Sequence, residues 1–271
     1  SITRCAHDLR GIFDAFSART CAAQIRLFIL RPLMPTIILT ATAFEQQILR
    51  DQLTHPAQQN VPHNTWTRGI LGNRPIVLIE AGIGLVNTSH ALTVALQQIN
   101  PDLVIQTGIG GAYLQANLNI GDLVLATEEN NAELGVITPQ GWHPANEIGI
   151  PVLKTDQEYF NTYPLEKSLV DEALSALHKE QDNVVAGPFV TVQQCSGRTD
   201  IGNELGQRFN AICENMEGAA AAQLCLLYNV PFLELRAISN QVEDRNRDAW
   251  DIPLALERSQ TATSKLIHAL S

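Results

Sequence analysis

The chain has 271 residues, enough for one large core or two modest domains. Its 45% hydrophobic and 17% charged residues are typical of a globular protein. The formal net charge of −10 argues against binding to nucleic acid or to an anionic membrane, because both favour a basic face. Five irregularly spaced cysteines and scattered histidines form neither a disulfide framework nor a metal site. We expect reduced thiols and a cytoplasmic location.

The first 35 residues differ in composition from the rest of the chain. Residues 1–33 hold five arginines and only two acidic residues, the balance typical of a transit peptide. Their apolar run is too short and too interrupted to span a bilayer. Met34-Pro35-Thr36 leads directly into an apolar strand, so translation starting at Met34 is the alternative explanation. We expect 1–35 to be an N-terminal extension of one of these two kinds.

Strand-like and helix-like segments alternate from residue 36 onward. Continuous apolar runs predict buried strands at 36–43, 75–80, 102–107, 122–127, 186–192 and 231–239. Helices are expected at 44–54, 85–99, 165–179, 203–210, 216–228 and 253–269. In the second of these helices, Val86, Leu92 and Ile99 belong to one apolar stripe. Since no repeat or linker interrupts the alternation, we expect a single α/β domain over 36–271.

Two glycine turns follow predicted strands, Gly82-Ile83-Gly84 and Gly108-Ile109-Gly110. Each begins like a dinucleotide-binding fingerprint, but Asn87 and Tyr113 stand where the third glycine is needed. The sequence also contains no P-loop lysine motif and no Gly-x-Ser-x-Gly elbow. These observations argue against dinucleotide, P-loop and serine-hydrolase sites.

Polar groups at element ends near the C-terminus indicate a ligand site. Residues 213–218 read Cys-Glu-Asn-Met-Glu-Gly and place a carboxylate beside a methionine at the start of an alanine-rich helix. Residues 236–240 read Arg-Ala-Ile-Ser-Asn and end an apolar strand with a cation and an amide. Ligands collect where strands end and helices begin in open α/β sheets. A methionine to pack a sugar, a carboxylate for its hydroxyls and an amide for a base together indicate a nucleoside site.

Taken in chain order, these motifs resemble the nucleoside phosphorylase and nucleoside hydrolase superfamily. The resemblance covers nearly everything after residue 36 and rests on segments 40–51, 80–87, 106–124, 215–219 and 236–240. It implies a three-layer α/β/α sandwich with a central mixed, partly barrel-like sheet, formed by a catalytic domain over 36–271. It also implies a nucleoside substrate, water as co-reactant, no cofactor and a homo-oligomer.

Within that superfamily the sequence is most similar to the futalosine hydrolases. The residues that carry this likeness are Gly-Pro-Phe-Val-Thr-Val at 187–192 and the run from Ile238 to Ile252. That family removes hypoxanthine from futalosine with water, in the alternative menaquinone pathway, and leaves a ribose that carries a carboxyphenyl-ketone arm. The resemblance therefore implies hydrolysis of futalosine to hypoxanthine and dehypoxanthine futalosine.

The resemblance assigns catalytic roles to three residues. Asn240 stands where relatives that cleave adenine nucleosides carry an aspartate, and a neutral amide suits a 6-oxopurine because it both donates and accepts. Glu45 would activate or orient the attacking water, and Arg236 would help to place it. The alternatives are a turn-capping asparagine, a solvated glutamate, and an arginine paired with Glu243 or Asp244.

Further residues are expected to bind the substrate. Glu217 would accept hydrogen bonds from the ribose hydroxyls while Met216 packs on the sugar, or Glu217 is simply a carboxylate favoured at a helix N-terminus. The other expected contacts are Gly110, Gly111, Thr191, Gln194, Cys195, Asn215, Ser239 and Trp250. Arg245 or Arg247 would meet the substrate carboxylate while Trp250 packs on its aromatic ring; alternatively, the charges of this loop pair among themselves.

Position 109 bears on the nucleophile. Relatives carry there a serine that hydrogen-bonds phosphate or water, whereas Ile109 offers no side-chain hydrogen bond, which favours hydrolysis over phosphorolysis. A purine nucleoside phosphorylase is therefore disfavoured, and Asn240 disfavours a methylthioadenosine or adenosylhomocysteine nucleosidase. A catalytically silent nucleoside-binding protein would lack Glu45, Glu217 or Arg236, and all three are present.

Overall fold

The computed structural model describes residues 34–61, 63–180 and 182–270. The chain divides into the units Ser1–Leu33 and Met34–Ser271, and the fold of the second is described below. The predicted N-terminal extension lies almost wholly outside the described residues, so both explanations of it stay predictions. None of the helices in the described ranges is long and apolar enough to cross a membrane.

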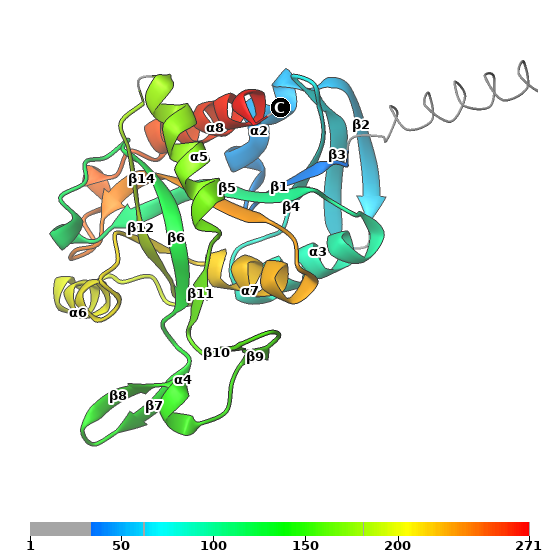
Figure 1. Ribbon diagram of the computed structural model, residues 1–271. Coiled ribbons are helices and arrows are strands. Elements are labelled where there is room, and N and C mark those ends of the chain that lie inside the picture. The colour runs from blue at the N-terminus through cyan, green and yellow to red at the C-terminus, as the bar shows by residue number, and fades with distance from the viewer. Residues whose placement is uncertain (1–33, 62, 181, 271) are drawn as a thin grey trace, which may run out of the picture. The chain divides into compact units, whose positions relative to one another are not determined.

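A mixed sheet of ten strands forms the centre of the described unit (Figure 1). Its strands are β1 (Thr36–Thr40), β2 (Thr54–Val61), β3 (Asn64–Leu71), β4 (Arg74–Glu80), β5 (Leu103–Ala112), β6 (Leu123–Asn131), β11 (Thr162–Pro164), β12 (Val184–Thr191), β13 (Cys213–Asn215) and β14 (Phe232–Gln241). The strands β1, β4, β5 and β14 run parallel, while β2, β3 and β11 pair with antiparallel neighbours.

Five of these strands close into a ring. β14 pairs with both β5 and β6, β6 pairs with β12, and β13 joins β12 back to β5. Within this ring, β5 and β14 each have a hydrogen-bonded strand on both sides. Most of their side chains are therefore buried. This arrangement confirms the predicted mixed, partly barrel-like sheet.

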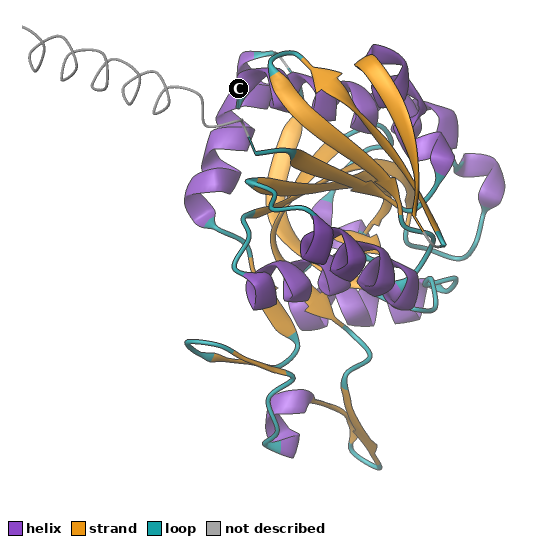
Figure 2. Cartoon of the chain, turned by 90° about the vertical axis from the view of Figure 1, so that its right-hand side faces the viewer, coloured by secondary structure: helices purple, strands orange, loops and turns teal. Residues whose placement is uncertain are grey.

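Helices cover both faces of the sheet (Figure 2). They are α2 (Gln47–Gln52) after the 3-10 turn η1 (Ala43–Gln46), α3 (Leu85–Gln98), α5 (Lys167–Lys179), α6 (Thr199–Phe209), α7 (Gly218–Tyr228) and α8 (Ile252–Ala269). In Figure 1, α3 and α7 lie together below the sheet, whereas α2, α5 and α8 lie above it. The predicted three-layer α/β/α sandwich is confirmed.

The residues of α7 explain its position close to the sheet. Ala219, Ala221 and Ala222 are buried, and their small side chains allow the helix backbone to approach its neighbours. In α3 the buried face comprises Thr88, Ala91, Leu92 and Ala95. Val86 is 78% exposed, because the first turn of α3 lies at the surface. Its predicted place on the apolar stripe was therefore wrong.

Besides the short strands β11 and β13, two larger features were absent from the sequence prediction. The hairpin of β2 and β3 extends the sheet beyond β4, and most side chains of β2 are exposed. Between β6 and β11 the chain forms an arm that projects from the sheet in Figure 1. The arm contains β7 (Gly135–Thr138), β8 (Gly141–Pro144), α4 (Ala145–Ile148), β9 (Leu153–Lys154) and β10 (Glu158–Tyr159). Both were missed because they lack the apolar runs that mark buried strands.

Candidate functional site

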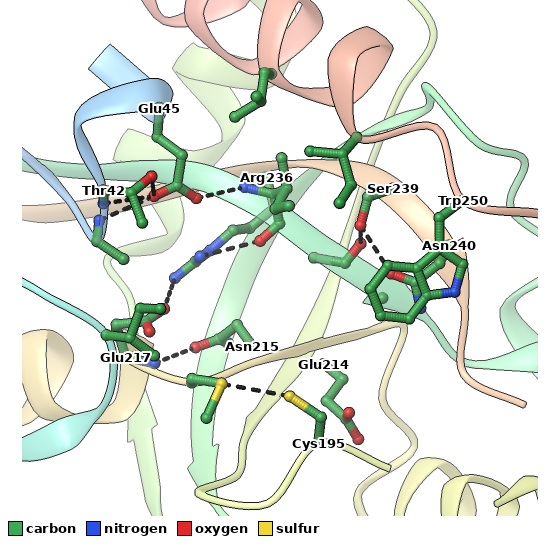
Figure 3. Close-up of a pocket in the computed structure, with 18 of the residues that line it drawn as sticks. Thr42, Glu45, Cys195, Glu214, Asn215, Glu217, Arg236, Ser239, Asn240 and Trp250 are labelled. Carbon is green, nitrogen blue, oxygen red and sulfur yellow. Dashed lines mark hydrogen bonds and ion pairs between the residues drawn. The ribbon is translucent and has the colours of Figure 1, made fainter. Parts of the chain in front are cut away.

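A pocket of about 400 Å³ opens at the carboxyl ends of β1, β5 and β14. It also receives the start of α7 and the loop before α8 (Figure 3). This size is typical of a small-molecule site. Of the predicted site residues, it brings together Glu45, Gly110, Gly111, Cys195, Asn215, Met216, Glu217, Arg236, Ser239, Asn240 and Trp250.

Thr191 and Gln194 do not line this pocket. Thr191 is fully buried behind Asn215, where its hydroxyl lies 2.7 Å from Glu129 Oε2 and accepts the Ala219 N–H at 2.8 Å. Gln194 is exposed, because the chain leaves the sheet after Thr191 and turns that side chain outward. Their prediction as substrate contacts is corrected accordingly. Thr191 supports the site from behind.

Glu45 is held at the end of β1 by main-chain donors. Its Oε2 accepts from the N–H groups of Ala41 at 3.1 Å and Thr42 at 2.9 Å. Its Oε1 accepts from Ile109 N–H at 3.1 Å. The return of a glutamate to the amide three residues earlier is half of a capping box, a local reason for this placement. Glu45 is only 5% exposed, so the alternative of a solvated glutamate is wrong.

The electrostatic surroundings of Glu45 raise the pKa of its carboxyl group. Burial raises the pKa of the Glu45 carboxyl above its ordinary value, and the nearby charge of Glu217 adds to this effect. The Arg236 cation and the Ile109 and Thr42 amides act in the opposite direction, and burial outweighs them. A carboxylate with these properties can orient a water molecule and accept its proton.

Arg236 lies inside β14, between Glu45 and Glu217 (Figure 3). Its Nε donates to Glu234 Oε1 at 2.9 Å, and its Nη2 lies 3.3 Å from Glu217 Oε2. Nη1 donates to the carbonyl of Ile109 at 3.1 Å. Burial disfavours the guanidinium charge, but the surrounding carboxylates, Glu234 first, outweigh it and raise the pKa of Arg236. The residue is a fixed cation.

The expected alternative ion pair of Arg236 with Glu243 or Asp244 was wrong. β14 continues to Gln241, which carries those two residues beyond the strand. Asp244 instead accepts the Thr199 N–H at 2.9 Å. The partners of Arg236 are Glu234, two residues earlier in the strand, and Glu217 at the start of α7.

The start of α7 is fixed by the Asn215 amide. Its Oδ1 accepts the N–H groups of Glu217 at 2.9 Å and Gly218 at 2.7 Å, and its Nδ2 donates to Glu129 at 2.5 Å. These contacts satisfy helix N-terminal amides. Glu217 in turn accepts the Gly84 N–H through Oε1 at 3.0 Å, which connects α7 to the Gly82-Ile83-Gly84 turn. Asn215 is thus chiefly a structural cap, because its polar atoms are engaged within the protein.

Asn240 and Trp250 lie on the opposite side of the pocket (Figure 3). The Ser239 hydroxyl donates to Asn240 Oδ1 at 2.8 Å, and Asn240 Nδ2 donates to the carbonyl of Gln241 at 2.9 Å. The register of β14 against β5 shifts between Ile238 and Asn240, which turns this end of the strand. An amide has further donor and acceptor capacity, so Asn240 retains a polar edge for a ligand.

The loop before α8 carries two arginines beside Trp250. The Arg245 guanidinium lies 5.2 Å from the centre of the indole, and that of Arg247 lies 6.0 Å away. Arg245 lines the pocket and Arg247 does not. Neither arginine forms an ion pair with a described carboxylate, so the alternative of charges pairing within the loop is wrong for both.

Several lining residues were missed by the sequence prediction. Glu214 is buried and accepts the Ser196 N–H at 2.9 Å, the Ser196 hydroxyl at 2.5 Å and the Tyr113 hydroxyl at 3.1 Å. Burial raises the pKa of Glu214, although these donors lower it in part. Phe44 and Ile83 contribute apolar surface. A carboxylate between buried residues, as in Cys213-Glu214-Asn215, was the available signal for Glu214.

Within the described ranges, no group of three or more His, Cys, Asp or Glu side chains is arranged to hold a metal ion. The buried polar groups of the pocket are instead the Glu45, Glu214 and Glu217 carboxylates, the Asn215 amide and the Arg236 guanidinium, which are hydrogen-bonded to other side chains or to the main chain. Independence from a cofactor stays a prediction.

Comparison with known proteins extends these observations. Residues 35–271 match the model of the Phosphorylase superfamily. The chain is 27% identical over 234 residues to the 5'-methylthioadenosine/S-adenosylhomocysteine nucleosidase of Staphylococcus aureus (strain MRSA252), covering 86% of this chain and 97% of the relative.

Solved structures show the same fold. An S-adenosylhomocysteine nucleosidase from Streptococcus pyogenes superposes with a TM-score of 0.78 at 22% identity, covering 89% of this chain and 98% of that one. The native futalosine hydrolase of Helicobacter pylori strain 26695 gives 0.75 at 20% identity, covering 87% and 97%. The family model spans nearly the whole described part of the chain, and the chain therefore belongs to the Phosphorylase superfamily.

Proposed function

We propose that the protein is a nucleosidase that hydrolyses the N-glycosidic bond of a purine nucleoside without a cofactor. The observation that carries this proposal is the buried triad Glu45, Arg236 and Glu217 on one side of the pocket, with the Asn240 amide on the other. The pocket between them, about 400 Å³, would take a sugar beside the triad and a base beside Asn240. Relatives named as nucleosidases support the same reaction class.

The charges of the pocket favour water over phosphate. Glu45 and Glu217 line it, and Glu234 lies directly behind Arg236. A phosphate dianion placed near these carboxylates would be repelled, and the Arg236 charge is already shared between two of them. Ile109 uses its N–H for Glu45 and its carbonyl for Arg236, so this turn offers phosphate neither a hydroxyl nor its amide.

In the proposed mechanism, Glu45 orients the attacking water and accepts its proton. Glu217 accepts hydrogen bonds from ribose hydroxyls, and Met216 packs on the sugar. As the glycosidic bond breaks, the ribose gains oxocarbenium character, and the fixed carboxylates stabilise that positive charge. The water oxygen bonds to C1' as the C1'–N9 electron pair leaves with the base. Asn240 hydrogen-bonds the departing base, which takes up a proton from solvent.

Futalosine is the proposed substrate. The Asn240 amide supports a 6-oxopurine such as hypoxanthine, because it can donate to the carbonyl oxygen. Arg245 and Trp250 at the pocket mouth support a 5' arm that carries both a carboxylate and an aromatic ring. The protein would then act in the futalosine route to menaquinone.

Methylthioadenosine or S-adenosylhomocysteine is the second candidate substrate. The similarity to the Staphylococcus aureus nucleosidase over 97% of that protein favours it. Asn240 counts against it in our proposal, because adenine presents an amino group where hypoxanthine presents an oxygen.

The test is a comparison of futalosine, inosine, methylthioadenosine and S-adenosylhomocysteine, each incubated with the protein in the presence and absence of phosphate. Free base and sugar products are separated by chromatography. We expect hypoxanthine from futalosine at a rate independent of phosphate. Faster release of adenine from either adenine nucleoside would contradict the substrate, and a requirement for phosphate would contradict hydrolysis.

A further inference from the structure

Two buried carboxyl groups lie behind the pocket and have no part in the proposed mechanism. Glu129 belongs to β6 and Glu234 to β14, and both are 0% exposed. Neither lines the pocket. Burying a charge is costly unless it is paired, so each carboxyl group requires a physical account.

Most of their oxygens have a donor. Glu129 Oε1 accepts from Asn215 Nδ2 at 2.5 Å, and Glu129 Oε2 accepts from the Thr191 hydroxyl at 2.7 Å. Glu234 Oε1 accepts from Arg236 Nε at 2.9 Å. No amide, hydroxyl or guanidinium among the described residues donates to Glu234 Oε2.

The backbone of Gly218 shows where this last oxygen points. A Cβ added at Gly218 would overlap both Glu129 Oε1 and Glu234 Oε2, so the two oxygens converge on the same position at the start of α7. Two facing carboxylates repel each other unless a proton lies between them. Arg236 contacts the other oxygen of Glu234 and offsets only part of this repulsion.

We propose that Glu129 and Glu234 share one proton and act as a positioning pair for the nucleosidase site. Glu129 is neutral, donates its proton to Glu234 Oε2, and holds Asn215. Asn215 fixes the start of α7 and thereby Glu217. Glu234 keeps its negative charge and holds Arg236. The inference rests on the proposed roles of Glu217 and Arg236, but not on futalosine as the substrate.

The electrostatic surroundings agree with this assignment. Burial raises the pKa of Glu129 well above its ordinary value of 4.5, and the Glu234 charge raises it further. Burial also raises the pKa of Glu234, where Arg236 acts in the opposite direction. The proton therefore belongs to Glu129.

The other titratable groups that face the pair are Arg236, Glu217, Cys213 and Tyr113. Burial raises the pKa of the Cys213 thiol and of the Tyr113 hydroxyl, so both are neutral at physiological pH. Removal of the shared proton would place a second, uncompensated anion beside Glu234. Arg236 and Asn215 would then lose their fixed positions.

The test compares Glu129→Gln with Glu234→Gln. A glutamine at 129 keeps the link to Glu234, since its Nε2 in place of Oε1 donates to Glu234 Oε2 while its carbonyl accepts from Thr191. Asn215 Nδ2 loses Glu129 as its acceptor, but it retains the Val190 carbonyl at 3.5 Å, and Asn215 Oδ1 retains the two amides of α7. We expect Glu129→Gln to keep kcat/KM within about threefold of the wild type, whereas Glu234→Gln, which removes the charge opposite Arg236, lowers it by about tenfold or more. A role in packing alone would affect both variants equally.

The pH dependence of stability gives a readout that is independent of activity. Because the pKa of Glu129 is raised, the folded state keeps a proton that the unfolded chain releases above about 4.5, and stability falls as the pH rises through the folded-state pKa. With rising pH, the melting temperature of Glu129→Gln should fall less than that of the wild type, because glutamine has no proton to release. If the melting temperature of the variant fell with pH as steeply as that of the wild type, the proposal of a shared proton would be refuted.

The comparison is made on whichever nucleoside the protein hydrolyses. If the wild type does not hydrolyse futalosine, the proposed substrate is refuted. The Glu129–Glu234 pair can then still be tested on an adenine nucleoside. Equal loss of activity in the two glutamine variants, with folding intact by circular dichroism, would refute the positioning pair. Glu129→Leu serves as the variant that removes all three hydrogen bonds of Glu129, to Asn215, Thr191 and Glu234, and should lose activity.

Discussion

The inner wall of the pocket and its rim differ in burial and in hydrogen bonding. On the inner wall, Glu45, Glu217 and Arg236 are nearly inaccessible to solvent and are hydrogen-bonded to main-chain groups or to one another. On the rim, Phe44 is 75% exposed and Arg245 has no carboxylate partner among the described residues. The inner wall is organised before a ligand arrives, whereas the rim offers unsatisfied groups for the ligand to use.

This difference separates reaction from recognition. Preorganised charges accelerate a reaction because they do not need to reorient when charge develops in the transition state. Exposed groups contribute binding energy that depends on what the ligand presents. Substitutions in the inner wall should therefore change kcat, and substitutions on the rim should change KM.

The largest effect is expected at the inner wall, from Glu45→Gln. The substitution keeps the shape but removes the proton acceptor, so kcat should fall by about 10²- to 10⁴-fold. Base release under saturating substrate measures it, and Glu257→Gln on the exposed surface of α8 is the matched control. Unchanged kcat in Glu45→Gln would remove this residue from the reaction.

The wild-type pH profile gives a related check on Glu45. Because burial raises the pKa of this carboxyl above 4.5, its ionised form is lost on acidification at a higher pH than for an ordinary glutamate. The acid limb of kcat/KM should therefore have an apparent pKa above 4.5. An acid limb at or below 4.5 would mean that another group controls it.

The second largest effect is expected where the base would bind, from Asn240→Asp. The ratio of hypoxanthine release to adenine release should fall by about tenfold or more, because a carboxyl group no longer offers an N–H to a 6-oxopurine. Competition between futalosine and methylthioadenosine measures this ratio. Asn146→Asp, on the exposed α4, should leave it unchanged.

A smaller effect concerns the stability of the inner wall. Gly218→Ala places a Cβ against Glu129 and Glu234, and overpacking of this kind costs about 1–3 kcal/mol of unfolding free energy. Chemical denaturation measures the loss. Gly197→Ala is the control, because an added Cβ there meets no neighbour closer than 4.0 Å. Equal stability of the two variants would show that the carboxyl pair adjusts freely.

The smallest effect is expected on the rim, from Arg245→Met. KM for futalosine should rise about three- to tenfold with little change in kcat, since an exposed charge contributes only modest binding energy. KM for methylthioadenosine, whose arm is uncharged, should not change. Arg247→Met is the control, because Arg247 lies beside the same indole but outside the pocket. A fall in kcat would mean that Arg245 takes part in the reaction, as the residues of the inner wall do.

The central strands and the covering helices were predictable because burial on both faces leaves a plain apolar signature. The Ile-Ile-Leu run of β1 and the Leu-Val-Ile run of β5 are examples. β2 was not predictable, since Thr54–Val61 is polar and mostly exposed and gains its strand form from pairing with β3. The arm after β6 was missed for the same reason.

The pocket was predicted best where polar residues end a strand. Glu45 lies just after β1 and Asn240 is the last residue but one of β14, and parallel strands bring such ends to one edge. Side chains inside strands were harder to place, because a shift of one residue reverses the face they occupy. Thr191 was assigned to the pocket for this reason. Glu129 and Glu234 were passed over, although Glu234 lies between Leu233 and Leu235 in a strand predicted to be buried, which signals an unusual ionisable group.

Glu45 contacts residue 109 through that residue's main-chain N–H, and Arg236 contacts it through the carbonyl. Neither contact depends on which side chain stands at this position. A change of side chain alone, such as Ile109→Ser, therefore alters what this turn presents to the pocket and leaves both main-chain contacts, and with them the Glu45 carboxylate and the Arg236 guanidinium, in place.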